Sequence, residues 1–82
     1  MITKLFSLYD GKSGIFSHPF HAVNEQVAIR SVVDLCREKN QISNNPSDFT
    51  LHEVGEFDDN LGLFIARPTT NPIAIVANLI RE

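Results

Sequence analysis

The sequence contains one cysteine, Cys36, and no tryptophan among its 82 residues. A single cysteine cannot form an internal disulfide, and disulfide frameworks are the usual support of small secreted domains. No basic segment followed by an apolar one opens the chain at Met1, as a secretory leader would require. We therefore expect a protein that works in the cytosol.

Long apolar runs and an excess of positive charge are also missing. The longest apolar run, residues 73–80, is interrupted by Asn78 and falls short of the roughly 20 residues that a membrane-spanning helix needs. Seven Lys and Arg residues stand against ten Asp and Glu residues, which gives a formal net charge of −3. Because this balance does not attract phosphate groups from a distance, any nucleic-acid site must be a local cluster, and no membrane partner is expected.

The chain nevertheless has the apolar content of a folded domain. Its 43% of hydrophobic and 21% of charged residues separate it from disordered chains. Eighty-two residues leave no room for a second domain, so residues 1–82 are predicted to form one domain. A domain of this size buries a limited share of its surface and is often stabilised by a partner subunit. The apolar tail over residues 73–80 therefore suggests a homodimer.

An amphipathic helix is predicted over residues 25–39. Asn24 is a suitable N-cap, because its side-chain oxygen can accept from the free amides at a helix start, and Asn40 can end the helix. Apolar residues recur at helical spacing and charged residues occupy the remaining surface, which predicts that one face packs against a sheet. The apolar stripe consists of Ala28, Val32, Leu35 and Cys36, widened by Ile29 and Val33.

Alternating apolar residues predict strands before and after this helix in the sequence. Residues 2–9 alternate with period two and predict an N-terminal strand. Residues 49–57 and 63–66 flank a polar turn and predict a hairpin that Pro68 terminates. The alternation slips near Gly55, where a β-bulge would use a glycine.

The last segment starts with Asn71 and Pro72, a pattern typical of a helix start, and predicts a C-terminal helix over residues 73–80. A β-rich tail fits the same residues. The predicted fold is α+β: a small antiparallel sheet made of the N-terminal strand and the C-terminal hairpin, covered by one amphipathic helix, with a C-terminal helix.

Several residues suggest a reactive or ligand-binding group, but their spacing does not match that of the corresponding motif. Gly11, Lys12 and Ser13 match the end of a phosphate-binding loop, but Phe6 stands where its first glycine is required. His18 and His21 are spaced to share a metal only on a helix, which Pro19 disfavours, and His52 and Cys36 are distant in sequence. We therefore predict no phosphate loop and no metal site.

Catalysis is not expected either. Glu53 and Glu56 are predicted to be solvated charges on an exposed strand edge, where such charges discourage edge association. Cys36 lies on the apolar stripe of its helix, where burial raises the pKa of a thiol and leaves it inert. The protein is therefore predicted to be no enzyme and to hold no cofactor.

Aromatic and basic residues are mixed in the N-terminal half of the chain. Rings of this kind stack on the bases of a single nucleic-acid strand, and nearby cations contact its phosphates. We predict that four residues share one DNA-binding face, namely Tyr9, Lys12, Phe20 and Arg30. The alternative is that the rings pack in the core and the cations are ordinary surface residues.

Short segments in a fixed order resemble the small nonstructural protein of gokushovirus-type microviruses, the small single-stranded DNA phages of bacteria. The resemblance covers roughly residues 4–63 and is carried by Leu8-Tyr9-Asp10-Gly11-Lys12-Ser13, Pro19-Phe20, Asn24 with Ala28-Ile29-Arg30, Pro46-Ser47-Asp48-Phe49-Thr50-Leu51, and Val54-Gly55-Glu56-Phe57-Asp58 with Gly62. None of these segments is an enzyme signature, so the order and spacing carry the match.

The resemblance implies a protein made during infection and absent from the virion, active in the cytoplasm of the infected bacterial host. Such proteins are described as DNA-binding and are assigned to the switch toward single-strand synthesis and packaging. The function expected here is therefore non-enzymatic binding of single-stranded DNA. The alternative is a protein-interaction module that docks on the phage or host replication machinery without binding DNA, which the acidic balance of the chain would suit.

Overall fold

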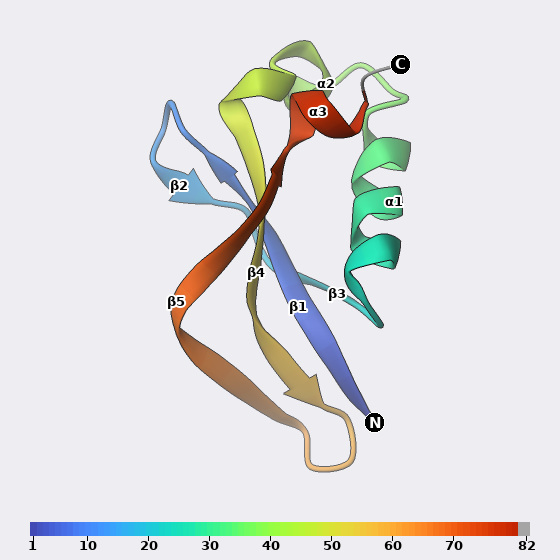
Figure 1. Ribbon diagram of the computed structural model, residues 1–82, viewed down its shortest axis with the longest axis vertical. Coiled ribbons are helices and arrows are strands. Elements are labelled where there is room, and N and C mark those ends of the chain that lie inside the picture. Colours follow the sequence, from blue (N-terminus) through green and yellow to red (C-terminus); the bar gives the residue numbers. More distant parts are fainter. Residues whose placement is uncertain (81–82) are drawn as a thin grey trace.

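The computed structural model describes residues 1–80 and, within them, every side chain except those of Pro68 and Thr69. Its centre is a five-stranded antiparallel sheet with the strand order β2-β1-β4-β5, in which β3 also pairs with β1 (Figure 1). In chain order the elements are β1 (Ile2–Asp10), β2 (Ile15–Phe16), β3 (Phe20–Ala22), α1 (Glu25–Leu35), α2 (Gln41–Asn44), the 3-10 helix η1 (Pro46–Asp48), β4 (Phe49–Asp58), β5 (Leu63–Ile75) and α3 (Val76–Leu79). The α+β prediction is confirmed. Within residues 1–80, no helix has the length and apolarity needed to cross a membrane.

The core lies between one face of the sheet and the helices, and we call this face the inner face. Phe6 and Leu51 bring buried side chains from β1 and β4, and the helices contribute Ala28, Val32 and Val76. Strand residues alternate between faces, so the neighbours of Phe6 and Leu51 along each strand lie on the opposite, outer face. The predicted packing of the amphipathic helix against the sheet is confirmed.

The helix α1 begins where the sequence predicts and ends earlier. The Asn24 side chain accepts a 2.9 Å hydrogen bond from the Val27 amide, which confirms the N-cap. The helix ends at Leu35 instead of continuing to residue 39, because the Asn40 side chain donates to the Leu35 carbonyl and accepts from the Ile42 amide. Asn40 therefore begins the next helix, α2, and does not extend the first.

The C-terminal segment differs most from its prediction. The strand β5 does not stop at Pro68, and no helix begins at Pro72; the strand continues to Ile75, and α3 is a single turn from Val76 to Leu79. Pro72 pairs with His52 of β4, and β5 is the last strand of the sheet, where a residue without an amide proton is tolerated. The apolar tail is held within its own chain, since Val76 is fully buried.

A bulge separates the part of β4 that lies under α1 from the part that forms the hairpin. The pairing register of β4 shifts between Glu53 and Gly55 on both of its sides, which confirms the predicted bulge. A Cβ atom at position 55 would lie 2.7 Å from the Ile65 carbonyl oxygen, so only glycine fits this close approach. Beyond the bulge, the hairpin extends past the end of α1 (Figure 1).

Candidate functional site

Three rings from three strands meet on the outer face of the sheet. The ring centroids of Tyr9 and Phe16 lie 4.7 Å apart, those of Phe16 and His52 lie 5.2 Å apart, and those of Tyr9 and His52 lie 5.9 Å apart. These separations are typical of interacting aromatic rings. We call Tyr9, Phe16 and His52 the aromatic platform. Phe16 remains 39% exposed, so the platform is open to solvent.

Strand pairing places these rings together. Tyr9 of β1 pairs directly with Phe16 of β2, so the two side chains stand on the same face. His52 pairs with Ser7 of β1, two residues before Tyr9, and therefore shares that face. The Ser7 hydroxyl donates a 2.6 Å hydrogen bond to the Ser17 carbonyl, which fixes the chain directly after Phe16 against β1.

The His52 ring is held by a hydrogen bond and by partial burial. Its Nδ1 atom lies 3.0 Å from the Thr70 hydroxyl oxygen of β5. Burial disfavours the charged imidazolium and lowers the pKa of His52 below its usual value. At neutral pH the platform therefore presents a neutral imidazole beside two aromatic rings.

Lowering the pH from about 7.5 to about 5.5 is expected to weaken the fold through His52. Because its pKa is lower in the folded protein than in the unfolded chain, the unfolded state takes up the proton first. The stability that His52 contributes is complete above the unfolded pKa of about 6.5 and is lost as the pH falls below it. We expect a loss under about 1 kcal/mol, measured by urea unfolding at both pH values. An equally large pH dependence in His52→Gln would assign the loss to other groups.

A tight turn beside the platform presents Lys12. The Asp10 carboxylate accepts hydrogen bonds of 3.0 Å from the Lys12 amide and from the Ser13 hydroxyl, and these bonds, the Lys12 amide first, lower the pKa of Asp10. Gly14 completes the turn with a φ of 72°, a value that favours glycine. The Lys12 side chain is 78% exposed, and its Nζ atom lies 3.6 Å from an Asp48 oxygen. The turn that follows Tyr9 therefore carries an exposed cation, whose ammonium group lies near Asp48.

The structure separates the four residues predicted to form one DNA-binding face. Tyr9 and Lys12 belong to the platform and its adjoining turn. Phe20 pairs with Phe6, so its ring lies on the inner face, with the two ring centroids 6.1 Å apart. Arg30 is exposed on α1, the helix that covers the inner face. The expectation of a single shared face is therefore wrong, because strand alternation sends Tyr9 and Phe20 to opposite sides of the sheet.

The sheet contains a buried carboxylate, Glu53, whose burial the sequence did not predict. Glu53 was expected on an exposed edge, but β4 lies between β1 and β5, and the side chain is 5% exposed. Its Oε1 atom lies 3.6 Å from Lys4 Nζ, and its Oε2 atom forms an ion pair with Arg67. Oε2 makes no well-oriented hydrogen bond, so the arginine charge is its compensation. Both cations are thereby occupied within the protein.

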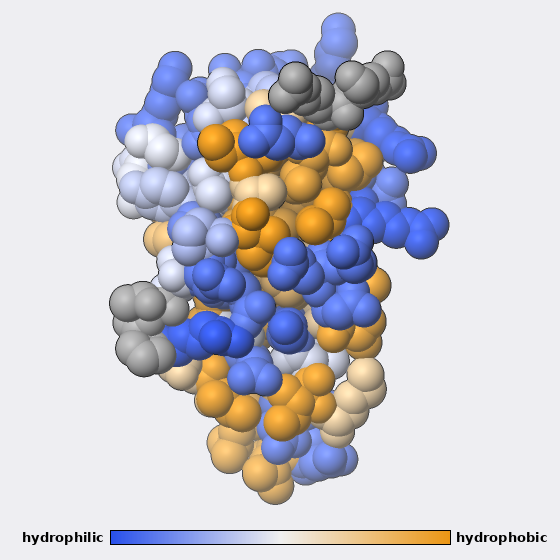
Figure 2. Space-filling view, in the orientation of Figure 1, coloured by the Kyte–Doolittle hydropathy of each residue, from blue (hydrophilic) through white to orange (hydrophobic). Residues whose placement is uncertain are grey.

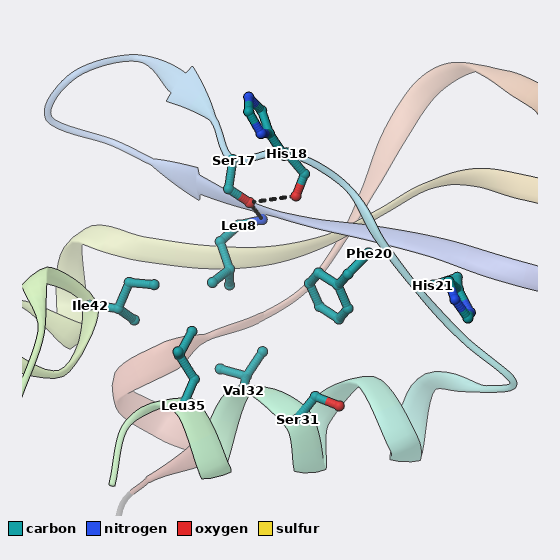
Figure 3. A pocket seen from close by; sticks show the side chains of 9 residues that line it. All are labelled: Leu8, Ser17, His18, Phe20, His21, Ser31, Val32, Leu35 and Ile42. Carbon is teal, nitrogen blue, oxygen red and sulfur yellow. Dashed lines mark hydrogen bonds between the residues drawn. The ribbon is translucent and has the colours of Figure 1, made fainter. Parts of the chain in front are cut away.

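A pocket of about 480 Å³ lies between α1 and the chain that leads into β3 (Figure 3). The side chains of Leu8, Phe20, Val32 and Leu35 point toward one another across it, whereas the His18 ring points away from them. Among the residues that the structure describes, no lysine or arginine lines this pocket. Over residues 1–80, no three His, Cys, Asp or Glu side chains gather as a metal site would require. The surface of the pocket is mainly apolar, and its lining also includes Ser17, His18, His21 and Ser31.

Comparisons with known proteins give one family. No curated protein and no solved structure matches the chain. Residues 3–80 match the profile of the phage ORF5 protein family. This match includes the strands that carry the aromatic platform, the helix α1 and the whole β4–β5 hairpin. The match spans nearly the entire sequence, and the chain therefore belongs to the phage ORF5 protein family.

Proposed function

We propose that this phage protein binds single-stranded DNA on the aromatic platform. It would act without catalysis, as a nonstructural protein of a gokushovirus-type microvirus, and support viral single-strand synthesis or packaging in the cytoplasm of the infected bacterium. The observation that carries this proposal is the set of three rings, with centroids 4.7 to 5.9 Å apart, on the outer face of the sheet.

Stacking suits this surface. Every base has a flat π-face, and base–aromatic stacking is worth about 1 to 3 kcal/mol per base with little dependence on sequence. Tyr9 and Phe16 are held in place by direct strand pairing, so little side-chain freedom would be lost when a base stacks on them. The helices α1 and α3 pack on the inner face through Val32 and Val76, which leaves the platform to the ligand.

Phosphate contacts would contribute less than stacking. Lys12, on the turn that follows Tyr9, is 78% exposed and lies near the surface carboxylate of Asp48, whereas Lys4 and Arg67 are engaged by the buried carboxylate of Glu53. Each phosphate neutralised on a single strand changes log K by about −0.7 per unit of log salt concentration. We therefore expect a shallow salt dependence, with a slope of about −0.7 for the single contact of Lys12, and weak to moderate affinity.

The fluorescence of Tyr9 gives a direct readout, because the chain has one tyrosine and no tryptophan. Titration with an unlabelled oligothymidine at low salt is expected to quench this emission as a base stacks on the ring. For variants, the anisotropy of a labelled oligonucleotide gives the affinity. Phe16→Ala and Tyr9→Ala should each weaken binding about 5- to 100-fold. Lys12→Ala should weaken it a few fold and reduce the salt slope by about 0.7.

Arg30→Ala is the matched control, because this cation is exposed on the helix that covers the inner face. Its affinity should equal that of the unchanged protein. Absence of binding at low salt would reject the proposed function. Binding that Arg30→Ala weakens more than Phe16→Ala would place the DNA on α1 and reject the platform.

A second candidate function is docking on the phage or host replication machinery without direct DNA contact. The observation that favours it is the exposure of Leu61, Leu63 and Phe64 at the hairpin, each between 57% and 70%. Exposed apolar residues in this number are typical of protein contacts. Under this alternative, oligonucleotide titration gives no signal, while the protein recovers a replication protein from infected cells.

A further inference from the structure

The end of the β4–β5 hairpin leaves the body of the protein as an apolar arm. It extends past α1 at the end of the molecule opposite α2 and α3 (Figure 1). Figure 2 shows apolar side chains at this end, separated by a polar belt from those near α3. We define the hairpin arm by six apolar residues that are each 43% to 70% exposed, namely Met1, Ile2, Leu61, Leu63, Phe64 and Ile65.

The exposed area of the hairpin arm is large for a protein of this size. The six side chains, which strand alternation distributes over both faces of the hairpin, present on the order of 600 Å² of apolar surface. A stable interface buries about 800 Å² per partner. Pairing of two arms would cover part of the roughly 600 Å², which is less than this area, so we expect a weak dimer.

One side of the hairpin arm is an unprotected strand edge. β5 ends the strand order, so its outer side has no neighbour in the part of the chain that the structure describes. Natural edge strands are usually blocked by lysine, proline or bulges. The segment Leu63–Ala66 contains no lysine or proline, whereas Arg67, Pro68 and Pro72 follow it. The open edge is therefore confined to the arm.

We propose that a second copy of this chain occupies the edge, with the 63–66 segments of the two copies paired as antiparallel strands about a twofold axis at Ile65, so that the two Ile65 residues lie opposite each other. Such a contact uses the same segment in both copies and closes on itself, so it gives a dimer and no filament. Pairing buries part of the exposed side chains of Leu63, Phe64 and Ile65. The prolines after the segment cannot donate backbone hydrogen bonds, so they limit the length of the paired strands.

Charge favours the antiparallel direction. The tip of the hairpin arm carries Asp58 and Asp59, whereas the cations at its base, Lys4 and Arg67, are paired with Glu53. Antiparallel pairing keeps the acidic tips of the two arms apart, which is favourable. Parallel pairing would bring the two acidic tips together at a cost.

The dimer would also place the two platforms on one surface. Antiparallel strands of one sheet are related by a twofold axis perpendicular to that sheet, so the outer faces of both copies point the same way. A single DNA strand crossing both platforms would bind more tightly than one platform allows. This consequence rests on the proposed function, whereas the dimer itself does not.

Sedimentation equilibrium of the full chain without DNA, from about 1 to about 500 µM, tests the dimer. The unchanged protein should pass from monomer to dimer and stop there. Phe64→Lys should raise the dissociation constant about 30-fold or more, as expected for a central apolar contact. Ile15→Lys is the matched control, because Ile15 is 65% exposed and Phe64 is 70% exposed, and it should leave the constant unchanged. Far-ultraviolet circular dichroism verifies that both variants fold.

Cross-linking locates the contact, because the chain has a single natural cysteine. In a Cys36→Ser background, Ile65→Cys should form a disulfide-linked dimer under mild oxidation, and Ile15→Cys should not. A monomer at every concentration overturns the proposal. A dimer that Ile15→Lys disrupts and Phe64→Lys does not, or oligomers that keep growing with concentration, also overturn it. DNA titration of Phe64→Lys separates the DNA-binding hypothesis from the dimer hypothesis. A monomer keeps one platform per chain, so it should still bind DNA even though the dimer is lost.

Discussion

Replacing Phe6 with alanine is expected to lower the free energy of unfolding by about 3 to 5 kcal/mol. The side chain is fully buried between the sheet and α1, and its ring packs on Phe20. Removing the ring takes away apolar burial and leaves a cavity that the surrounding strands cannot fill, because β1 is paired on both sides. Small domains are stable by about 5 to 15 kcal/mol, so this change removes a large part of the total.

Urea unfolding followed by circular dichroism measures this loss. Val27→Ala is the control: Val27 lies on α1 but is 40% exposed, so its truncation should cost less than about 1 kcal/mol. Phe6→Leu, which keeps most of the volume, should cost less than Phe6→Ala. A loss below about 1 kcal/mol for Phe6→Ala would mean that the sheet and helix are not packed around this ring.

Local signals in the sequence were sufficient for much of the fold. The alternation in residues 2–9 and the N-cap at Asn24 each depend on neighbouring residues; the strand forms where predicted, and the helix begins where predicted. The bulge at Gly55 was found because a slip in alternation and a glycine coincide. Each of these features is decided within a few residues of the chain, where pattern and propensity agree.

The C-terminal segment could not be predicted in the same way. Asn71 and Pro72 have the composition of a helix start, yet Pro72 is the partner of His52 in the sheet. Pairing of β5 with β4 along Asn71–Ile75 satisfies more backbone groups than one helical turn would, and the edge position tolerates the proline. The outcome depends on contacts between residues about 20 positions apart, which no local pattern records.

The candidate site likewise contains residues that local signals predict and residues that depend on long-range contacts. Tyr9 and Phe16 each lie one residue outside the pair that flanks the four-residue turn 11–14, which contains two glycines, so their pairing in a short hairpin is readable from the sequence. His52 joins them only through the register of β1 against β4. Phe20 was misplaced because its face depends on its pairing with Phe6, after a segment that is not in a strand. The burial of Glu53 likewise required knowing that β4 is a central strand.

Replacing Arg67 with methionine is expected to lower the free energy of unfolding by about 2 to 3 kcal/mol. Breaking a buried ion pair from one side usually costs about 3 to 5 kcal/mol, because it leaves an uncompensated buried charge. The cost is lower here, since Arg67 is 37% exposed and Lys4 still lies 3.6 Å from the other Glu53 oxygen. Methionine keeps the apolar length of the side chain, so the loss reports the charge and not the packing.

A double-mutant cycle decides whether Arg67 acts through Glu53. Glu53→Gln removes the buried charge, and the two cations it leaves behind are each more than a third exposed and can be hydrated. Arg67→Met should therefore cost less than about 1 kcal/mol when Glu53→Gln is already present, which is a coupling of roughly 1 to 3 kcal/mol. Arg37→Met is the control, because its ion pair with Asp34 is exposed on both sides and should contribute almost nothing. Additive effects of Arg67→Met and Glu53→Gln would show that the carboxylate does not depend on the arginine and that the ion pair does not hold β4 and β5 together.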